Sequence, residues 1–225
     1  MDGLTTFKLN NLLKGPCNVL YADPSDVEPP DNIADIFDPD GNGYELVEGW
    51  KVFGATTAGT AYSRQFTTQG YQIEQATGNV DEDVTDAVRA VQLTAGEISA
   101  DVLAILEQSA PAKPVEKAKG RAPELQIRTG TVESLANYRV AFVGRRLVGK
   151  GADVTESGGK VRGAFVVGGL WTAKITGDQA AIQVARGQLA SAPLTLQAYI
   201  DDTQDEGEEH GFWFLEQSAT IEAAS

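Results

Sequence analysis

The stretch GWKVFGATTAGTAYSRQFTTQGYQIEQATGNV, residues 49–80, decides the fold class of this chain. Polar residues alternate with apolar or aromatic ones in short runs, and small Gly- and Thr-rich turns separate the runs. In the first run, Trp50 and Val52 alternate with Lys51 and Phe53. This period of two predicts a series of antiparallel strands. The outward positions carry Gln, Thr, Ser, Lys and Glu, so we expect a wall with one polar and one apolar face.

Strands are expected on both sides of this block as well. Short apolar or alternating runs bounded by turn residues occur at 17–22, 83–94, 125–129, 138–146, 161–176, 194–201 and 211–218. With about ten strands and one good helix, the sequence predicts a mainly β domain. The expected architecture is an antiparallel β-sandwich or half-barrel with one flanking α-helix.

The single helix is expected at residues 95–109. Thr94 and Glu97 have the spacing of a capping box, and Pro111 lies just beyond the expected end. One face of the helix carries an apolar stripe, formed by Ile98, Val102, Ile105 and Leu106. We therefore expect the helix to pack against a sheet or a neighbouring subunit, with Asp101, Glu107 and Gln108 outside.

One domain is expected at residues 17–218, preceded by an extended N-terminal arm, 1–16, that ends at a Gly-Pro pair. Within the domain, residues 23–49 are acidic and rich in Pro and Gly, and we interpret them as a long loop that contacts a neighbouring molecule. Residues 110–124 form a Pro- and Lys-rich connector, interpreted as a solvated linker or as a contact to an acidic neighbour. The last segment, 219–225, is expected to be a loose tail.

Composition limits the possible functions. The 225 residues include 32 acidic and 18 basic ones, for a net charge of −14, which argues against tight binding to nucleic acid or anionic membranes. Cys17 is the only cysteine, so no intramolecular disulfide is possible, and we expect a buried thiol. We find neither a signal peptide nor an apolar run long enough to span a membrane, so we expect synthesis in a cytoplasm and no membrane insertion.

Two stretches resemble ligand-binding loops, and both depart from the pattern they resemble. Residues 38–48 are similar to a calcium loop, but the twelfth position is Gly49, not the required Glu, so we favour a surface loop rich in Asx turns. Residues 144–151 are similar to a phosphate-binding loop, but Gly151 follows Lys150 where Ser or Thr is needed. We interpret them as a β-hairpin with basic residues near its tip.

The sequence offers no catalytic constellation. His210 is the only histidine, and Cys17 lies far from it, so no zinc set or catalytic triad is indicated. The acidic run around His210 is interpreted as a solvated loop between the last two strands; its acids are Asp201, Asp202, Asp205, Glu206, Glu208 and Glu209. We therefore expect neither an enzyme nor a bound cofactor or metal.

The order of elements resembles the major tail proteins, the tail-tube subunits of long-tailed (siphovirus-type) bacteriophages. The resemblance covers most of residues 15–218. It lies in GPCNVLYAD, in the acidic passage closing on GWKVFGATTAGTAYSR, in YQIEQ, in the helix ISADVLAILEQ, and in APLTLQAYIDD before GFWFLEQS. It implies a virion protein that forms stacked, hexameric rings around a tape-measure protein, contacts tail terminator and tip proteins, and lets viral DNA pass without specific binding.

Assembly contacts are expected at a small set of residues. The strands of residues 50–76 are predicted to contribute to the lumen wall, and the basic hairpin to meet acidic loops of an adjacent subunit. The candidate assembly residues are Trp50, Phe53, Tyr62, Arg64, Arg145, Arg146 and Lys150. Two alternatives remain open: a monomeric acidic β-sandwich binding module, with or without calcium, and the tube protein of a contractile injection or type VI secretion system.

Overall fold

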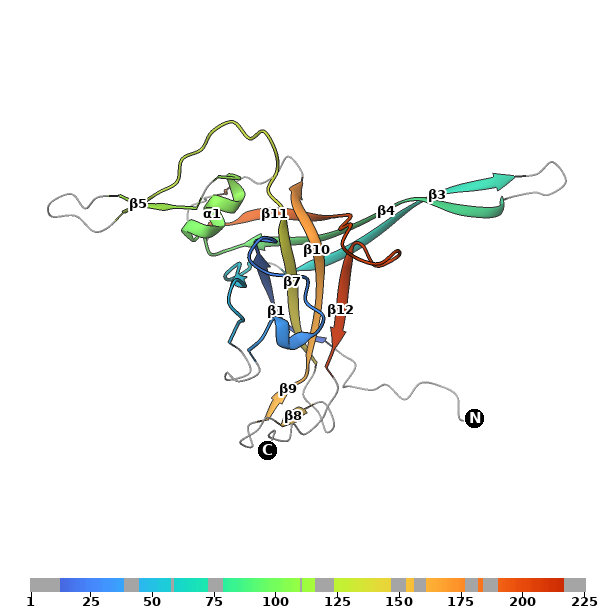
Figure 1. Cartoon of the computed structure of the whole chain (residues 1–225), viewed down its shortest axis with the longest axis horizontal. Helices are drawn as coiled ribbons and strands as arrows, with labels where there is room; N and C mark the ends of the chain where they lie inside the picture. Colours follow the sequence, from blue (N-terminus) through green and yellow to red (C-terminus); the bar gives the residue numbers. More distant parts are fainter. Residues whose placement is uncertain are drawn as a thin grey trace.

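The computed structural model describes residues 13–38, 45–57, 59–72, 79–109, 111–115, 124–146, 153–155, 161–176, 182–183 and 190–216. These residues form a mainly β structure with one α-helix, as predicted (Figure 1). The elements are β1 (Leu13–Ala22), the 3-10 helix η2 (Ile33–Asp35), β2 (Lys51–Val52), β3 (Ala61–Gln72), β4 (Asn79–Ala95), α1 (Ala100–Leu106), β5 (Lys113–Val115), β6 (Glu124–Gln126), β7 (Tyr138–Arg146), β8 (Asp153–Thr155), β9 (Val161–Gly163), β10 (Phe165–Thr176), β11 (Ala192–Tyr199) and β12 (Gly211–Leu215).

One antiparallel sheet of eight strands organises the body, in the order β2-β1-β7-β10-β11-β4-β3, with β12 also paired to β10. The first half of β10 lies between β7 and β12, and its second half pairs with β11. The register with β7 is irregular between Leu170 and Ala173. At this point the sheet turns, and the strands on either side of it run nearly crosswise (Figure 1).

Both faces of the central strands are buried. In β7, Val140 and Phe142 point into one core together with α1, whereas Ala141 and Val143 point into a second core. The same division holds in β1, where Val19 and Tyr21 alternate with Leu20 and Ala22. This explains why residues 138–143 carry an almost continuous apolar run, which is typical of a strand covered on both sides.

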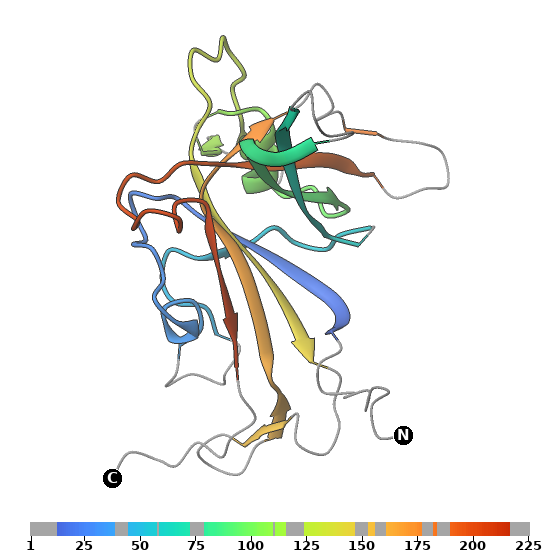
Figure 2. The ribbon, with the colours of Figure 1, turned by 90° about the vertical axis from the view of Figure 1, so that its right-hand side faces the viewer.

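The acidic segment 23–49 covers the second core. Ile36 is fully buried there, and Trp50 donates a hydrogen bond from Nε1 to the carbonyl oxygen of Asp35 at 3.2 Å. Phe37 stacks on Phe165 of β10 with ring centroids 4.9 Å apart. We predicted that this segment is a long loop that contacts a neighbouring molecule. Its described part instead packs on the sheet of its own chain (Figure 2).

The helix is shorter than predicted, and the predicted capping box is wrong. Thr94 belongs to β4, where it pairs with Pro193, and the Glu97 carboxylate accepts a hydrogen bond from the backbone N–H of Ala55. Ser99 caps α1 instead, since its Oγ accepts from the N–H of Val102 at 3.2 Å. The buried positions of α1 agree with the predicted stripe: Val102 and Ile105 lie in the first core.

Several predicted boundaries change. Most predicted strands are present, but β1 begins at Leu13, so residues 13–16 belong to the sheet and not to an arm; residues 1–12 lie outside the described part. The expected linker 110–124 contains β5, which forms a small hairpin with β6. Residues 50–53 do not alternate as expected, because Trp50 and Phe53 are buried while Lys51 and Val52 are exposed.

Two adjacent glycines in β10 make room for aromatic rings. A Cβ on Gly168 would overlap the ring of Phe142 and approach that of Trp213, and a Cβ on Gly169 would overlap the ring of Phe212. The absence of side chains lets Phe142 and Trp213 meet edge to face, with centroids 5.1 Å apart. The two glycines of the sequence VVGGLW therefore leave space in the middle of the sheet for the aromatic rings that pack on it.

We expect Gly168→Ala to lower the free energy of unfolding by about 1 to 3 kcal/mol, because the new methyl group forces Phe142 or Trp213 from its place. Urea denaturation followed by tryptophan fluorescence measures this change. Gly130→Ala is the control: a Cβ there meets nothing within 4 Å, so its effect should stay within about 0.5 kcal/mol. Equal effects of the two substitutions would contradict the proposed packing.

Candidate functional site

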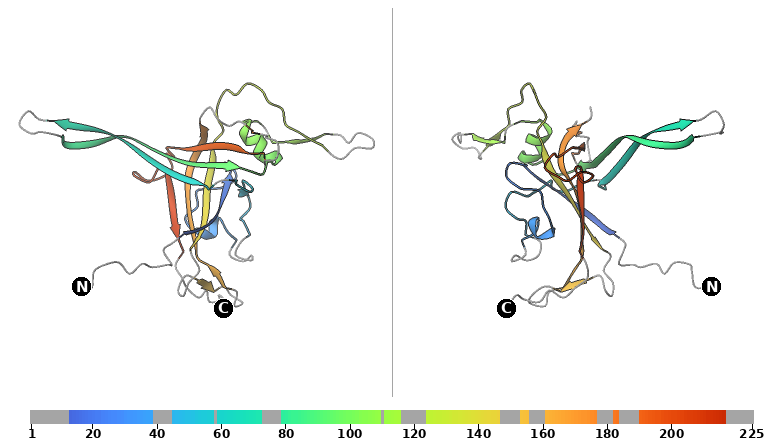
Figure 3. Two further views of the ribbon diagram at one scale, coloured as in Figure 1. Left: turned by 180° about the vertical axis from the view of Figure 1, so that it is seen from behind. Right: turned by 45° about the vertical axis from the view of Figure 1, so that its right-hand side comes forward.

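The most prominent surface feature is a long hairpin formed by β3 and β4. Only residues 90–95 of β4 pair with β11, whereas residues 79–89 have β3 as their sole neighbouring strand in the described structure. At about 3.3 Å per residue, this part projects roughly 35 Å from the body. Apolar side chains along it are exposed, including Phe66 at 45% and Val84 at 59%. Figures 1 and 3 show the outer part of the hairpin standing away from the body.

The hairpin extends a polar sheet face, which we call the polar face. The strand register places Lys174 beside Gln197, Ala90 and Ser63 across β10, β11, β4 and β3. Most of this surface is Thr, Gln and Ser, and farther out Thr67, Gln69 and Tyr71 lie opposite three acids. The charged residues described on it are Lys174, whose amine lies 4.8 Å from the centroid of the Tyr199 ring, and Asp81, Asp83 and Asp86.

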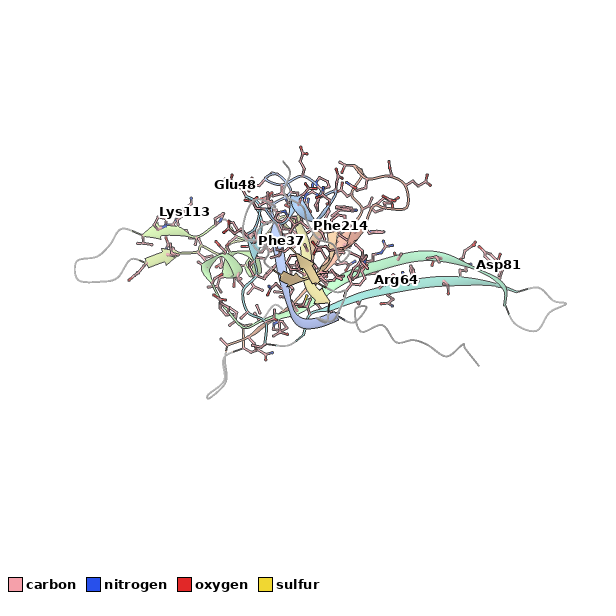
Figure 4. The ribbon with its side chains drawn as sticks, turned by 90° about the horizontal axis from the view of Figure 1, so that it is seen from below. Phe37, Glu48, Arg64, Asp81, Lys113 and Phe214 are labelled. Atoms are coloured by element: carbon pink, nitrogen blue, oxygen red, sulfur yellow. The ribbon has the colours of Figure 1, made fainter. Side chains whose placement is uncertain are left out.

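A second hairpin, β5–β6, projects from the opposite side of the body (Figure 4). Lys113 on β5 and Asp81 on β4 mark the two sides in this view. Residues 113–128 contain five basic and two acidic residues, whereas residues 65–86 contain five acidic residues and no basic one. The described part of the β3–β4 hairpin thus carries three acids near its outer end, at 81, 83 and 86, whereas the sequence of residues 113–128 has an excess of basic residues.

A buried ion pair lies behind this surface, at the turn of β10. Arg139 and Asp201 are 8% and 9% exposed, with 3.7 Å between guanidinium and carboxylate. Arg139 also donates from Nε to the carbonyl oxygen of Val27 at 2.7 Å and from a terminal nitrogen to that of Trp171 at 3.4 Å. Burial lowers the pKa of Arg139, against the raising influence of Asp201. We call this group the Arg139–Asp201 node; it links β7, β10, the 23–49 segment and the loop before β12.

The node corrects the prediction that Asp201 belongs to a solvated loop. Its carboxylate accepts hydrogen bonds from Thr172 and from both the backbone N–H and the hydroxyl of Thr203. Burial alone would raise the pKa of Asp201, but these bonds and the Arg139 charge lower it overall. Because the folded chain favours the ionised form, this stabilisation is present above the ordinary pKa of 3.8 and is lost as the pH falls below it.

His210 lies between the hairpin and the acidic loop. Its Nδ1 atom is buried and has no hydrogen-bond partner among the described residues. Burial lowers the pKa of His210, and the Arg89 charge lowers it further, while Glu209 and Asp86 act in the opposite direction. The pKa therefore lies below its ordinary value of 6.5, and the imidazole is neutral at pH 7.

The structure separates the candidate assembly residues. Trp50 and Phe53 are 5% and 1% exposed and belong to the two cores, so they offer no surface for an intersubunit contact. Tyr62 and Arg64 lie together at the base of the β3–β4 hairpin. Residues 145–146 end β7, where they pair with residues 13–14 of β1, and Lys150 lies outside the described residues. Arg89 was not among the predicted residues. It lies opposite Arg64 in the β3–β4 register, a pairing that no local sequence pattern marks.

The described residues contain no group of three or more His, Cys, Asp or Glu side chains arranged to hold a metal ion. The calcium-like stretch falls largely on residues 39–44, outside the described part. Cys17 is partly buried and free, and burial raises its pKa. Among the described helices, none is long and apolar enough to cross a membrane.

Comparison with known proteins adds no assignment. Neither a scan against protein-family models nor a search of curated proteins finds a match to this chain.

We expect Arg139→Met to lower the free energy of unfolding by about 3 kcal/mol, because it leaves the buried Asp201 carboxylate without a counter-charge. Asp201→Asn should cost less, since Arg139 keeps its two carbonyl partners. Urea denaturation measures both values, with Arg128→Met at an exposed site as the control. A cost for Arg139→Met no larger than that of Arg128→Met would show that the node contributes little.

The pKa of His210 can be measured directly, because the chain has a single histidine. We expect NMR titration of the folded protein to give a value below 6.5, and Arg89→Gln to raise it by removing a nearby positive charge. The chain unfolded in urea supplies the reference value. Because the folded chain favours neutral His210, protonation of this residue favours the unfolded chain. The free energy of unfolding should therefore fall as the pH drops below 6.5. A folded-state pKa at or above the unfolded one would contradict the described environment.

Proposed function

We propose that this chain is a structural subunit that polymerises through its β3–β4 hairpin into rings, and that the rings stack into a tube of the kind formed by the tail-tube proteins of long-tailed bacteriophages. The projecting hairpin is the observation that carries the proposal. Its distal strands pair with no other described strand, and the described side chains on both faces of its outer part are exposed.

Physical chemistry supports a protein partner for this hairpin. A two-stranded ribbon is marginally stable by itself in water, because it buries little apolar surface. In the described part of the chain no strand pairs with the outer edge of β3, a strand of 12 residues, and such an edge favours pairing with another strand. A neighbouring subunit would cover Phe66 and Val84 and satisfy this edge.

The two hairpins support a head-to-tail arrangement of identical subunits. The β3–β4 and β5–β6 hairpins leave the body on opposite sides (Figure 4). One copy can therefore present Asp81, Asp83 and Asp86 to the side of the next copy from which the basic sequence 113–128 departs. Head-to-tail contacts between different surfaces close into a ring when the rotation permits. Sixfold symmetry is taken from the resemblance to tail-tube proteins.

The polar face is the surface that we assign to the inside of the tube. Its neutral Thr, Gln and Ser residues and its acids at 81, 83 and 86 offer phosphate groups few cationic contacts. Tight binding to DNA arises when cationic side chains neutralise phosphates and release their counterions. A surface with few such side chains would let DNA pass without being held at fixed positions. In this proposal the protein belongs to the virion, surrounds a tape-measure protein, and meets terminator and tip proteins at the tube ends. Its role is structural, with no catalytic step.

The proposal predicts that the purified chain forms tubes as its concentration rises, visible by negative-stain electron microscopy. Replacing two exposed hairpin residues, Phe66→Asn with Val84→Asn, should abolish the tubes by removing the apolar contact to the neighbour. Because both side chains are exposed in the single chain, its urea denaturation midpoint should change little.

The matched control is Val52→Asn, which alters a residue of similar exposure on β2, at the other edge of the sheet. This variant should still form tubes. A wild-type chain that stays monomeric at every concentration in analytical ultracentrifugation would refute the proposal and favour a monomeric binding module.

A further inference from the structure

A pocket of about 350 Å³ lies where the β3–β4 hairpin meets the loop before β12. Its lining comes from β3, β4, this loop and β12, and consists of Tyr62, Arg64, Arg89, Gly207, Glu208, His210, Gly211 and Trp213. The pocket opens on the opposite face of the hairpin from the polar face, because Arg64 and Arg89 alternate with residues of that face.

Two arginines on neighbouring strands line this pocket. Arg64 and Arg89 are direct partners in the β3–β4 register, an arrangement that places like charges side by side and costs stability. Neither guanidinium forms an ion pair with any described carboxylate; Arg64 instead lies 4.8 Å from the centroid of the Phe66 ring. Glu208 lines the pocket without pairing with either arginine. Among the described residues, no carboxylate is in ion-pair contact with these two arginines, although Glu209 lies near enough to Arg89 for that charge to lower the pKa of Glu209. A carboxylate in direct contact would compensate the pair.

The remaining walls also suit a small planar anion. Trp213 meets both Tyr62 and Phe142 edge to face, and it is 47% exposed beside the arginines. His210 also lines the pocket, and its buried Nδ1 has no hydrogen-bond partner among the described residues. Toward a carboxylate this atom could act only as a donor, in the Nδ1–H tautomer. Two guanidinium groups beside an aromatic wall are chemically matched to a carboxylate, which they can bind through paired hydrogen bonds.

We propose that this pocket, named here the arginine pocket, receives a carboxylate side chain from a second copy of the chain and thereby fixes the register of neighbouring subunits. The inference rests on the proposed head-to-tail assembly. Glu and Asp outnumber Lys and Arg by 32 to 18, so an adjacent copy presents carboxylates at high local concentration. α1 lies on the other side of the body from the projecting β3–β4 hairpin, and its exposed Asp101 and Glu107 are the first candidates (Figure 3).

The first test compares assembly of the wild type with that of Arg64→Gln combined with Arg89→Gln. The double variant should raise the concentration needed for assembly at least about tenfold, because it removes the charge-assisted hydrogen bonds at each contact. Lys174→Gln is the control, since it also removes positive charge but on the polar face. Removing the opposed arginines should leave the urea denaturation midpoint unchanged or higher.

The second test locates the carboxylate. Arg89→Lys places an amine in the pocket, and a zero-length carbodiimide joins it to any carboxylate in direct contact. Mass spectrometry of mixed light and isotope-labelled subunits then distinguishes links between copies from links within one copy. We expect links between copies, absent when assembly is blocked by Phe66→Asn with Val84→Asn.

The outcomes separate this inference from the proposed function. If the wild type forms tubes but the double arginine variant assembles equally well, the pocket role is overturned and the tube proposal stands. Cross-links only to Glu208, Glu209 or Asp86 of the same copy overturn it as well. A wild type that never assembles overturns both.

Discussion

The turn in β10 is the constraint on which the rest of the structure depends. Before Trp171 the strand pairs with β7 and β12, and from Thr172 onward it pairs with β11. Changing partners frees backbone groups in a buried place, where an unsatisfied group is costly. Arg139 satisfies one of these groups by donating a hydrogen bond to the Trp171 carbonyl oxygen. Asp201 forms an ion pair with Arg139 and accepts a hydrogen bond from the Thr172 hydroxyl. A charged pair thus stabilises a change of strand direction inside an otherwise apolar body.

The body and the β3–β4 hairpin are stabilised in different ways. The body has two cores, one beneath α1 and one beneath the 23–49 segment, so its central strands are covered on both faces. The hairpin shares only residues 90–95 of β4 with this body through β11, and beyond them it relies on a single strand pair. This division leaves the proposed contact surface outside the folding core.

The sequence predicted the strand content well because most strands carry a pattern that depends on the chain alone. The run at 138–146 coincides with β7, and the alternation at 194–199 matches the burial of β11. The predicted start of the helix at Thr94 was wrong because threonine suits both a helix cap and a strand. Pairing of Thr94 with β11 places it in β4. The pairing of Arg139 with Asp201 joins residues far apart in sequence, and no local pattern encodes it. For the same reason, periodicity at 62–71 predicted a strand but not whether another element covers it.

The order of strand pairing along the chain has a consequence for synthesis. β3 and β4 are neighbours in sequence, so they can pair early. β1 can pair with β7, and β4 with β11, only after those later strands have been synthesised. A nascent chain would therefore display a finished hairpin while its body is still incomplete, at the stage when exposed strand edges most readily aggregate. Asp81, Asp83 and Asp86 near its outer end repel the same residues of other nascent chains. These acids would delay association on the ribosome until folded bodies bring a basic surface to meet them.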